Sequence, residues 1–179
     1  MEEYESSYYD SNDKRSIKVH DMEDQVQRLK EKHFFSEEAL RKSLDDFMQD
    51  SSGYIFKDII LFANSHKNDR LCVLSFGDKI FQEKKIKSSK IQNYISDIVI
   101  TNKTKAEALV DVFKEENVLL KEKMIFLDDR IEQISGVKKK FPDVITILIK
   151  RPKGRYSDEK NKYCDFEAHD LGEVEKIIS

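Results

Sequence analysis

The segment from Met124 to Asp129 constrains the fold of this chain more than any other. Four consecutive apolar residues, Met-Ile-Phe-Leu, run directly into two adjacent carboxylates, Asp128 and Asp129. Such a run, followed by an amphipathic segment, predicts a buried strand that ends where a helix begins. In an open parallel sheet, ligands bind just beyond the carboxyl ends of the strands. The pair is therefore either a Mg²⁺ site or the cap and first-turn acid of the next helix.

Strand and helix patterns alternate from residue 71 to residue 149, which predicts an α/β fold with parallel crossovers in a doubly wound sheet. The first third of the chain is helical in pattern and has no matching strand, with Ser36 as a predicted N-cap. The predicted strands are residues 71–74, 98–101, the run ending at Asp128, 144–149 and 165–171. The predicted helices include residues 22–29, 36–48, 55–63, 103–114, 131–140 and 173–178.

The composition argues against several classes of protein. The net charge is −3, with Lys and Arg spread along the chain, so a general nucleic-acid surface is not indicated. No apolar run approaches the roughly 18 residues of a membrane span, and no signal peptide is evident. Cys72 and Cys164 lack metal-ligand spacing, and Cys72, within an apolar strand, is predicted to be a buried free thiol. These features predict a cytoplasmic protein.

Polar side chains are expected at three strand ends. The first strand leads to Ser75, the second to Lys103 and Lys105, and the third to the aspartate pair. A hydroxyl, an ammonium group and two carboxylates at one sheet edge suit phosphoryl transfer. Each part also has a plainer interpretation, because a serine often caps a helix and lysines are often solvated. The repulsion within the aspartate pair further predicts that Asp128→Asn leaves the fold intact or stabilises it.

The runs LCVLSFGD, IVITNKTKAEAL and KMIFLDDR resemble motifs II, III and IV of the haloacid dehalogenase (HAD) superfamily. Members are mostly Mg²⁺-dependent phosphatases that use an aspartate nucleophile, and the resemblance covers roughly residues 36–171. It implies a HAD-like Rossmannoid three-layer sandwich, with a mostly parallel sheet and a small N-terminal helical cap-like segment. It also implies that Lys105, with Lys103 as second choice, is the motif III lysine. The remaining implied residues are Ser75, Phe76 and Gly77 for phosphate, and Asp128 and Asp129 for Mg²⁺.

Motif I of the family, an apolar strand ending in Asp-x-Asp-x-Thr, is not evident. Counting back from the first helix places it near Asp10, which would be the nucleophile and a metal ligand. Asn12 then stands where the acid/base belongs, and Lys14 stands where the threonine belongs. The segment around Asp21 is a poorer candidate. In the family, motif I lies on the central strand, between those that bear motifs II and IV.

The resemblance divides the chain into an uncertain N-terminal segment (1–21), a helical cap-like segment (22–66) and a HAD-like core (67–179). The expected function is Mg²⁺-dependent hydrolysis of a small phosphorylated molecule through an aspartyl-phosphate. One alternative is a HAD-fold binding or regulatory module without catalysis. Another is a receiver-like phosphoacceptor domain, although its acidic cluster would lie at the other end of the chain. Neither the substrate nor the oligomeric state follows from the sequence.

Overall fold

The computed structural model describes residues 26, 27, 30, 36–95, 97–116, 123–152, 154 and 156–179 of the chain. Within these residues the strands form two parallel sheets. Strand β1 (Cys72–Phe76) pairs with β2 (Asp97–Thr101). The second sheet has the order β3 (Ile125–Asp128), β4 (Ile145–Ile149) and β5 (Phe166–Ala168).

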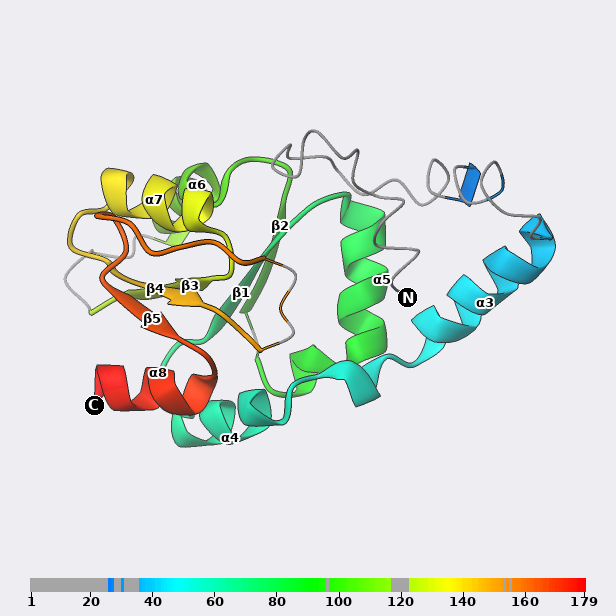
Figure 1. Cartoon of the computed structure of the whole chain (residues 1–179), viewed down its shortest axis with the longest axis horizontal. Helices are drawn as coiled ribbons and strands as arrows, with labels where there is room; N and C mark the ends of the chain where they lie inside the picture. The colour runs from blue at the N-terminus through cyan, green and yellow to red at the C-terminus, as the bar shows by residue number, and fades with distance from the viewer. Residues whose placement is uncertain are drawn as a thin grey trace.

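Helices connect the strands, and the alternation that the sequence predicts is confirmed. Each of the first three strands is followed by a helix, and β5 leads into the last one (Figure 1). The described helices are α3 (Glu37–Gln49), α4 (Lys57–Ser65), α5 (Lys79–Ser89), α6 (Lys105–Glu116), α7 (Ile131–Lys140) and α8 (Leu171–Ile178), with 3₁₀ turns η1 (Ser52–Tyr54) and η2 (Ile91–Asn93).

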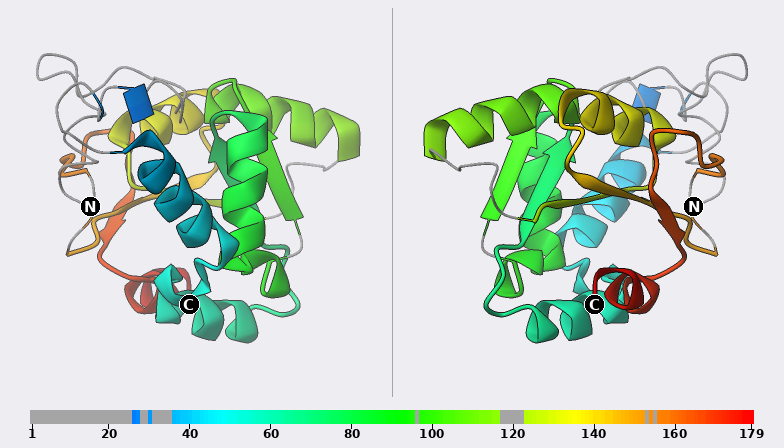
Figure 2. Two further views of the ribbon diagram at one scale, coloured as in Figure 1. Left: turned by 90° about the vertical axis from the view of Figure 1, so that its right-hand side faces the viewer. Right: turned by 90° about the vertical axis from the view of Figure 1, so that its left-hand side faces the viewer.

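Helices cover both faces of the three-stranded sheet, which gives three layers. Views from the two ends show α6 and α7 on one side of the strands and α4 and α8 on the other (Figure 2). On the α7 side, the fully buried Ile134 of α7 packs in one apolar cluster with Leu148 of β4. On the α8 side, Val174 of α8 packs in a second cluster with Ile147 of β4. Neighbouring residues of β4 therefore point to opposite cores, as expected of a strand buried on both faces.

The division into two sheets differs from the single sheet that the sequence predicts. Among the described residues, β1 pairs only with β2, and β3 pairs only with β4. Strand β1 still shares a core with β3, because Leu74 packs against the cluster that contains Phe126. The predicted motif I strand would lie between β1 and β3, but its candidates Asp10 and Asn12 lie outside the described residues.

Several local predictions are corrected by the structure. Strand β1 continues to Phe76, so Ser75 lies within the strand and not after it. Cys72 is exposed, and the prediction of a buried thiol was wrong, because Cys72 is the first residue of the strand and lies opposite the half-buried Asp97. Helix α4 starts at Lys57, because the backbone of Ile55 and Phe56 is extended.

The N-terminal part of the described chain is helical, as the sequence predicts. Ser36 is confirmed as the N-cap of α3, since its Oγ accepts a hydrogen bond from the N–H of Ala39. Helix α3 extends away from the three layers (Figure 1). Its apolar residues are not fully buried by the described chain, and Phe47 is 40% exposed. No helix in the described ranges has the length and apolar character that crossing a membrane requires.

His66 joins the end of α4 to the C-terminal helix. Its Nδ1 lies 2.6 Å from Oδ2 of Asp69, and its Nε2 lies 2.8 Å from Oε2 of Glu175 on α8. The ring also packs against Phe62, with 4.3 Å between centroids. The hydrogen bond to Asp69, with a smaller contribution from Glu175, raises the pKa of His66 above its ordinary value, although burial opposes the shift.

Because the folded state raises the pKa of His66, protonation stabilises the fold. This stability is fully present below the unfolded pKa of about 6.5 and is lost as pH rises through the folded pKa. Urea unfolding of the wild type and of His66→Gln between about pH 6 and pH 9 measures the effect. The wild type should lose more stability over this range than the variant. Parallel stability curves would show that the two carboxylates do not hold the histidine as described.

Candidate functional site

Asp128 and Lys105 form a mostly buried ion pair at the end of β3. Oδ2 of Asp128 lies 2.5 Å from Nζ of Lys105, and the exposed fractions of the two side chains are 1% and 20%. Oδ1 accepts a hydrogen bond of 2.9 Å from the backbone N–H of Arg130. Both oxygens of the buried carboxylate therefore have donors, as a buried charge requires.

The position of Lys105 follows from local sequence. Thr104 and Glu107 form a capping box, in which the N–H of Glu107 donates to Oγ1 of Thr104 and the N–H of Thr104 donates to Oε2 of Glu107. Helix α6 therefore begins at Lys105, at the carboxyl end of β2. The contact between Lys105 and Asp128 thus connects the ends of strands from the two sheets.

Gln133 supports this pair from α7. Its side chain is buried, and its Oε1 accepts a hydrogen bond of 3.2 Å from the backbone N–H of Lys105. Lys105 is therefore bound at two points, because Asp128 of β3 pairs with its side chain and Gln133 of α7 accepts its backbone N–H. Sequence reasoning missed Gln133, because a glutamine in an amphipathic helix gives no signal of its own.

Asp158 caps the helix that follows the aspartate pair. Its Oδ2 accepts a hydrogen bond of 2.9 Å from the N–H of Ile131, the first residue of α7. Arg130, the N-cap residue, makes no side-chain cap bond, and its guanidinium lies 5.2 Å from the centre of the Tyr156 ring. The N-terminus of α7 is therefore capped by Asp158 as well as by Asp128, which accepts the N–H of Arg130. Sequence reasoning did not predict the role of Asp158.

Asp129 is exposed, yet much of its carboxyl group is surrounded by protein. This desolvation, together with the charge of neighbouring Asp128, raises the pKa of Asp129, while Lys105 acts in the opposite direction. Two adjacent carboxylates in these surroundings repel each other, and a bound cation would relieve that repulsion.

The expected phosphate-binding residues of β1 have partners within the fold. Ser75 donates its hydroxyl hydrogen to Oε1 of Gln82, at 2.9 Å. The backbone N–H of Gly77 donates to the carbonyl of Thr101, at 3.0 Å, and Phe76 pairs with Thr101 in the β1–β2 ladder. Gly77 has φ +145°, a conformation that favours glycine.

The two candidate lysines differ in what they contact. Nζ of Lys103 lies 2.6 Å from Oδ2 of Asp111, and both side chains are exposed. Lys105 contacts buried Asp128 instead. The geometry therefore favours Lys105, the first choice of the sequence prediction, as the lysine of this site.

The described residues contain no group of three or more His, Cys, Asp or Glu side chains that could hold a metal ion. Asp128 and Asp129 supply two carboxylates, and Asp10, the third predicted ligand, lies outside the described residues. Two carboxylates suit Mg²⁺, which keeps several waters and takes other oxygens from substrate phosphate. The residues present thus fit this ion better than a metal that needs a complete protein cage.

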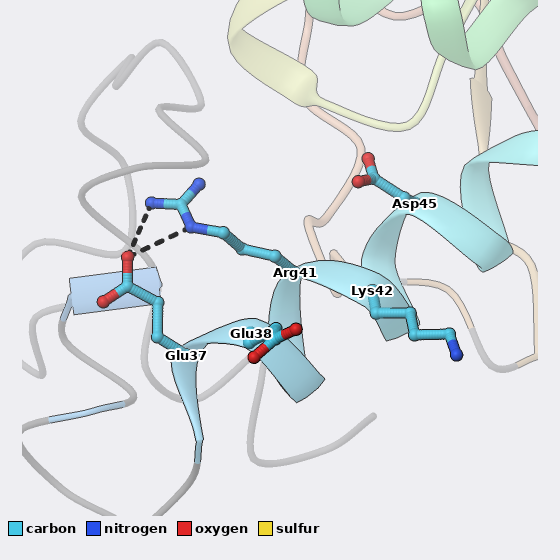
Figure 3. A pocket seen from close by; sticks show the side chains of 5 residues that line it. All are labelled: Glu37, Glu38, Arg41, Lys42 and Asp45. Atoms are coloured by element: carbon cyan, nitrogen blue, oxygen red, sulfur yellow. Dashed lines mark hydrogen bonds and ion pairs between the residues drawn. The ribbon is translucent and has the colours of Figure 1, made fainter.

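A shallow hollow elsewhere on the molecule lies along α3, and Figure 3 shows the side chains that line it. All come from this one helix, and Glu37 is paired with Arg41 at 3.1 Å. None belongs to the strand ends described above. Glu37 and Arg41 thus offset each other's charge within the hollow. The lining residues are Glu37, Glu38, Arg41, Lys42 and Asp45.

Comparison with solved structures identifies the architecture. A dehalogenase described as an intermediate complex superposes with a TM-score of 0.67 over 87% of this chain and 69% of that protein, at 16% sequence identity. The chain has the haloacid dehalogenase-like fold. A HAD-like hydrolase from Burkholderia xenovorans gives a TM-score of 0.61 at 18% identity, covering 86% of this chain and 73% of that one.

A further HAD-like structure is the hydrolase YfnB from Bacillus subtilis, described as bound to magnesium. It has a TM-score of 0.58 at 18% identity and covers 89% of this chain and 74% of that one. No family model matches the chain, and no curated protein matches it in sequence. At these identities the likeness establishes the HAD-like fold and leaves the activity to be argued from the site.

The ion pair changes the expectation for Asp128→Asn. Repulsion from Asp129 alone would make the substitution neutral or stabilising, but a neutral amide at this position would leave Lys105 without its buried counter-charge. We therefore expect a loss of about 1–3 kcal/mol in the free energy of unfolding. Urea denaturation measures it, with Asp129→Asn as the matched control, because Asp129 lacks a described ion pair with Lys105. An Asp128→Asn protein as stable as the wild type would show that Lys105 does not depend on a buried counter-charge at position 128.

Proposed function

We propose that this chain is a Mg²⁺-dependent phosphohydrolase that acts on a small phosphorylated compound through an aspartyl-phosphate. The observation that carries the proposal is the buried contact between Lys105 and Asp128 at the carboxyl ends of β2 and β3. This lysine lies beside a carboxylate pair, at the sheet edge where parallel strands of such a fold bind ligands. An apolar pair of similar size is often as stable as a buried ion pair, so function is the better explanation.

In this proposal each described residue has a distinct task. Asp128 and Asp129 would hold Mg²⁺, which supplies positive charge against the phosphate oxygens. Lys105 is 20% exposed, so its ammonium group can reach a ligand while it contacts Asp128. It would offset the charge of the phosphate and of an attacking carboxylate. Gln133 keeps the backbone of Lys105 in place.

The covalent step is assigned to Asp10. Its carboxylate oxygen attacks phosphorus, the ester P–O bond breaks, and the leaving alkoxide departs with the bonding electrons. Water then hydrolyses the aspartyl-phosphate and releases inorganic phosphate. Asn12 cannot transfer a proton, and general acid–base assistance is typically worth about 10²–10⁴-fold, so ordinary phosphate esters should react slowly. We also propose that residues 22–66 contribute to substrate choice.

The alternative is a binding or regulatory module that keeps the ion and phosphate contacts without turnover. The asparagine at position 12 and the absence of an evident motif I strand in the sequence favour it. Both hypotheses use Lys105 of α6 and the aspartate pair at the end of β3, so only a measurement of turnover separates them.

The test is hydrolysis of p-nitrophenyl phosphate, whose leaving group needs little protonation. Wild-type protein should release p-nitrophenol only with Mg²⁺. Lys105→Met should lower kcat/KM by about 100-fold or more, as expected for loss of one electrostatic contact in the transition state. Lys103→Met is the matched control and should keep wild-type activity.

Asp10→Asn should abolish turnover, and Asn12→Asp should raise it. Absence of Mg²⁺-dependent release by the wild type, or equal rates for wild type and Asp10→Asn, would favour the binding-module alternative.

A further inference from the structure

Gln82 occupies the place where Ser75 was expected to meet a phosphate. It is the fourth residue of α5, only 8% exposed, and its Oε1 accepts the hydroxyl hydrogen of Ser75. A serine hydroxyl has one hydrogen to donate. In this arrangement, therefore, Ser75 cannot also donate to a phosphate oxygen.

The bond to Ser75 fixes the direction of the Gln82 amide. With Oε1 held by the hydroxyl, Nε2 faces Gly77, and a Cβ added to Gly77 would lie 2.7 Å from Nε2. The glycine thus leaves the space that the amide occupies at the carboxyl end of β1.

The two hydrogens of Nε2 have no acceptor among the described residues. The side chain of Gln82 makes the bond to Ser75, through Oε1, and no described bond uses Nε2. Among the described residues, Oδ1 of Asp58 is the only side-chain nitrogen or oxygen that is both unpartnered and sealed from solvent. Nε2 of Gln82 therefore keeps some contact with solvent, and an anionic oxygen that reached it would accept its free hydrogens.

We propose that Nε2 of Gln82 donates to the phosphoryl oxygens of the ligand, and that Ser75 is a positioning residue that orients this amide. The inference rests on the proposed function for the nature of the ligand, and it replaces a direct contact of Ser75 with phosphate. Gly77 is required because it leaves room for the amide.

Binding of inorganic phosphate in the presence of MgCl₂, measured by calorimetry, tests the proposal. Gln82→Met keeps the size of the side chain but removes the donors, and Gln82→Glu keeps the acceptor for Ser75 while replacing the donors by charge. Both should weaken phosphate binding by roughly 10- to 100-fold, the effect of losing a hydrogen bond to a charged group. Gln92→Met, at an exposed glutamine of η2, is the control and should bind like the wild type.

Ser75 separates the two possible donors. If Ser75 acts through Gln82, Ser75→Ala should weaken binding less than Gln82→Met and should add nothing in the double variant. If Ser75 itself contacts phosphate, Gln82→Met would free its hydroxyl and binding would be kept or strengthened, while Ser75→Ala would lose it. That second pattern would overturn the proposal.

The outcome is distinguishable from that of the proposed function. A wild type that binds phosphate through Gln82 but hydrolyses no ester would sustain this inference and refute the enzyme. A wild type that hydrolyses p-nitrophenyl phosphate, with KM unchanged in Gln82→Met and Gln82→Glu, would refute the inference alone. A wild type that binds no phosphate would overturn it as well. Circular dichroism melting confirms that each variant is folded.

Discussion

The contact between Lys105 and Asp128 is the interaction on which the candidate site depends. It connects α6, the helix that follows β2 of one sheet, to β3 of the other, through a carboxylate that is 1% exposed. The surrounding bonds all support this pair, since Gln133 holds the backbone of Lys105 and the N–H of Arg130 donates to Asp128. Removing either charge would leave the other poorly compensated in a low-dielectric setting.

The same pair explains why the aspartates are more than the start of a helix. Helix α7 obtains its cap bond to Ile131 from Asp158, a residue of a distant loop. Asp128 accepts the N–H of Arg130 and pairs its other oxygen with a lysine, while burial and the charge of Asp128 raise the pKa of Asp129. A divalent cation bound here, as proposed, would offset the repulsion between the two carboxylates.

Much of the fold could be predicted from sequence, because apolar strands and amphipathic helices alternate clearly from residue 71 onward. The capping residues Ser36 and Thr104 fix helix starts through local bonds. The partners Gln82 and Gln133 could not be predicted, since each acquires its role only when folding brings it beside Ser75 or Lys105. The exposure of Cys72 was missed because an apolar run does not show which end of a strand is covered.

The candidate site lies between the two sheets. Strands β1 and β3 share apolar contacts through Leu74, but among the described residues no hydrogen-bonded strand joins them. Ser75 and Asp128 are therefore positioned by different sheets, and Lys105 provides the described polar link between the strand ends. The relative position of the ends of β1 and β3 therefore depends more on side-chain contacts than it would in one continuous sheet.

The most direct test of this account follows the backbone amide of Arg130 by NMR during titration with MgCl₂. This amide donates to Oδ1 of Asp128, so its resonance reports a cation at that carboxylate. We predict a saturable shift of the Arg130 and Lys105 amides that NaCl of equal ionic strength does not reproduce and that Asp128→Asn removes. Equal effects of the two salts, or a full shift in Asp128→Asn, would contradict a Mg²⁺ site at the end of β3.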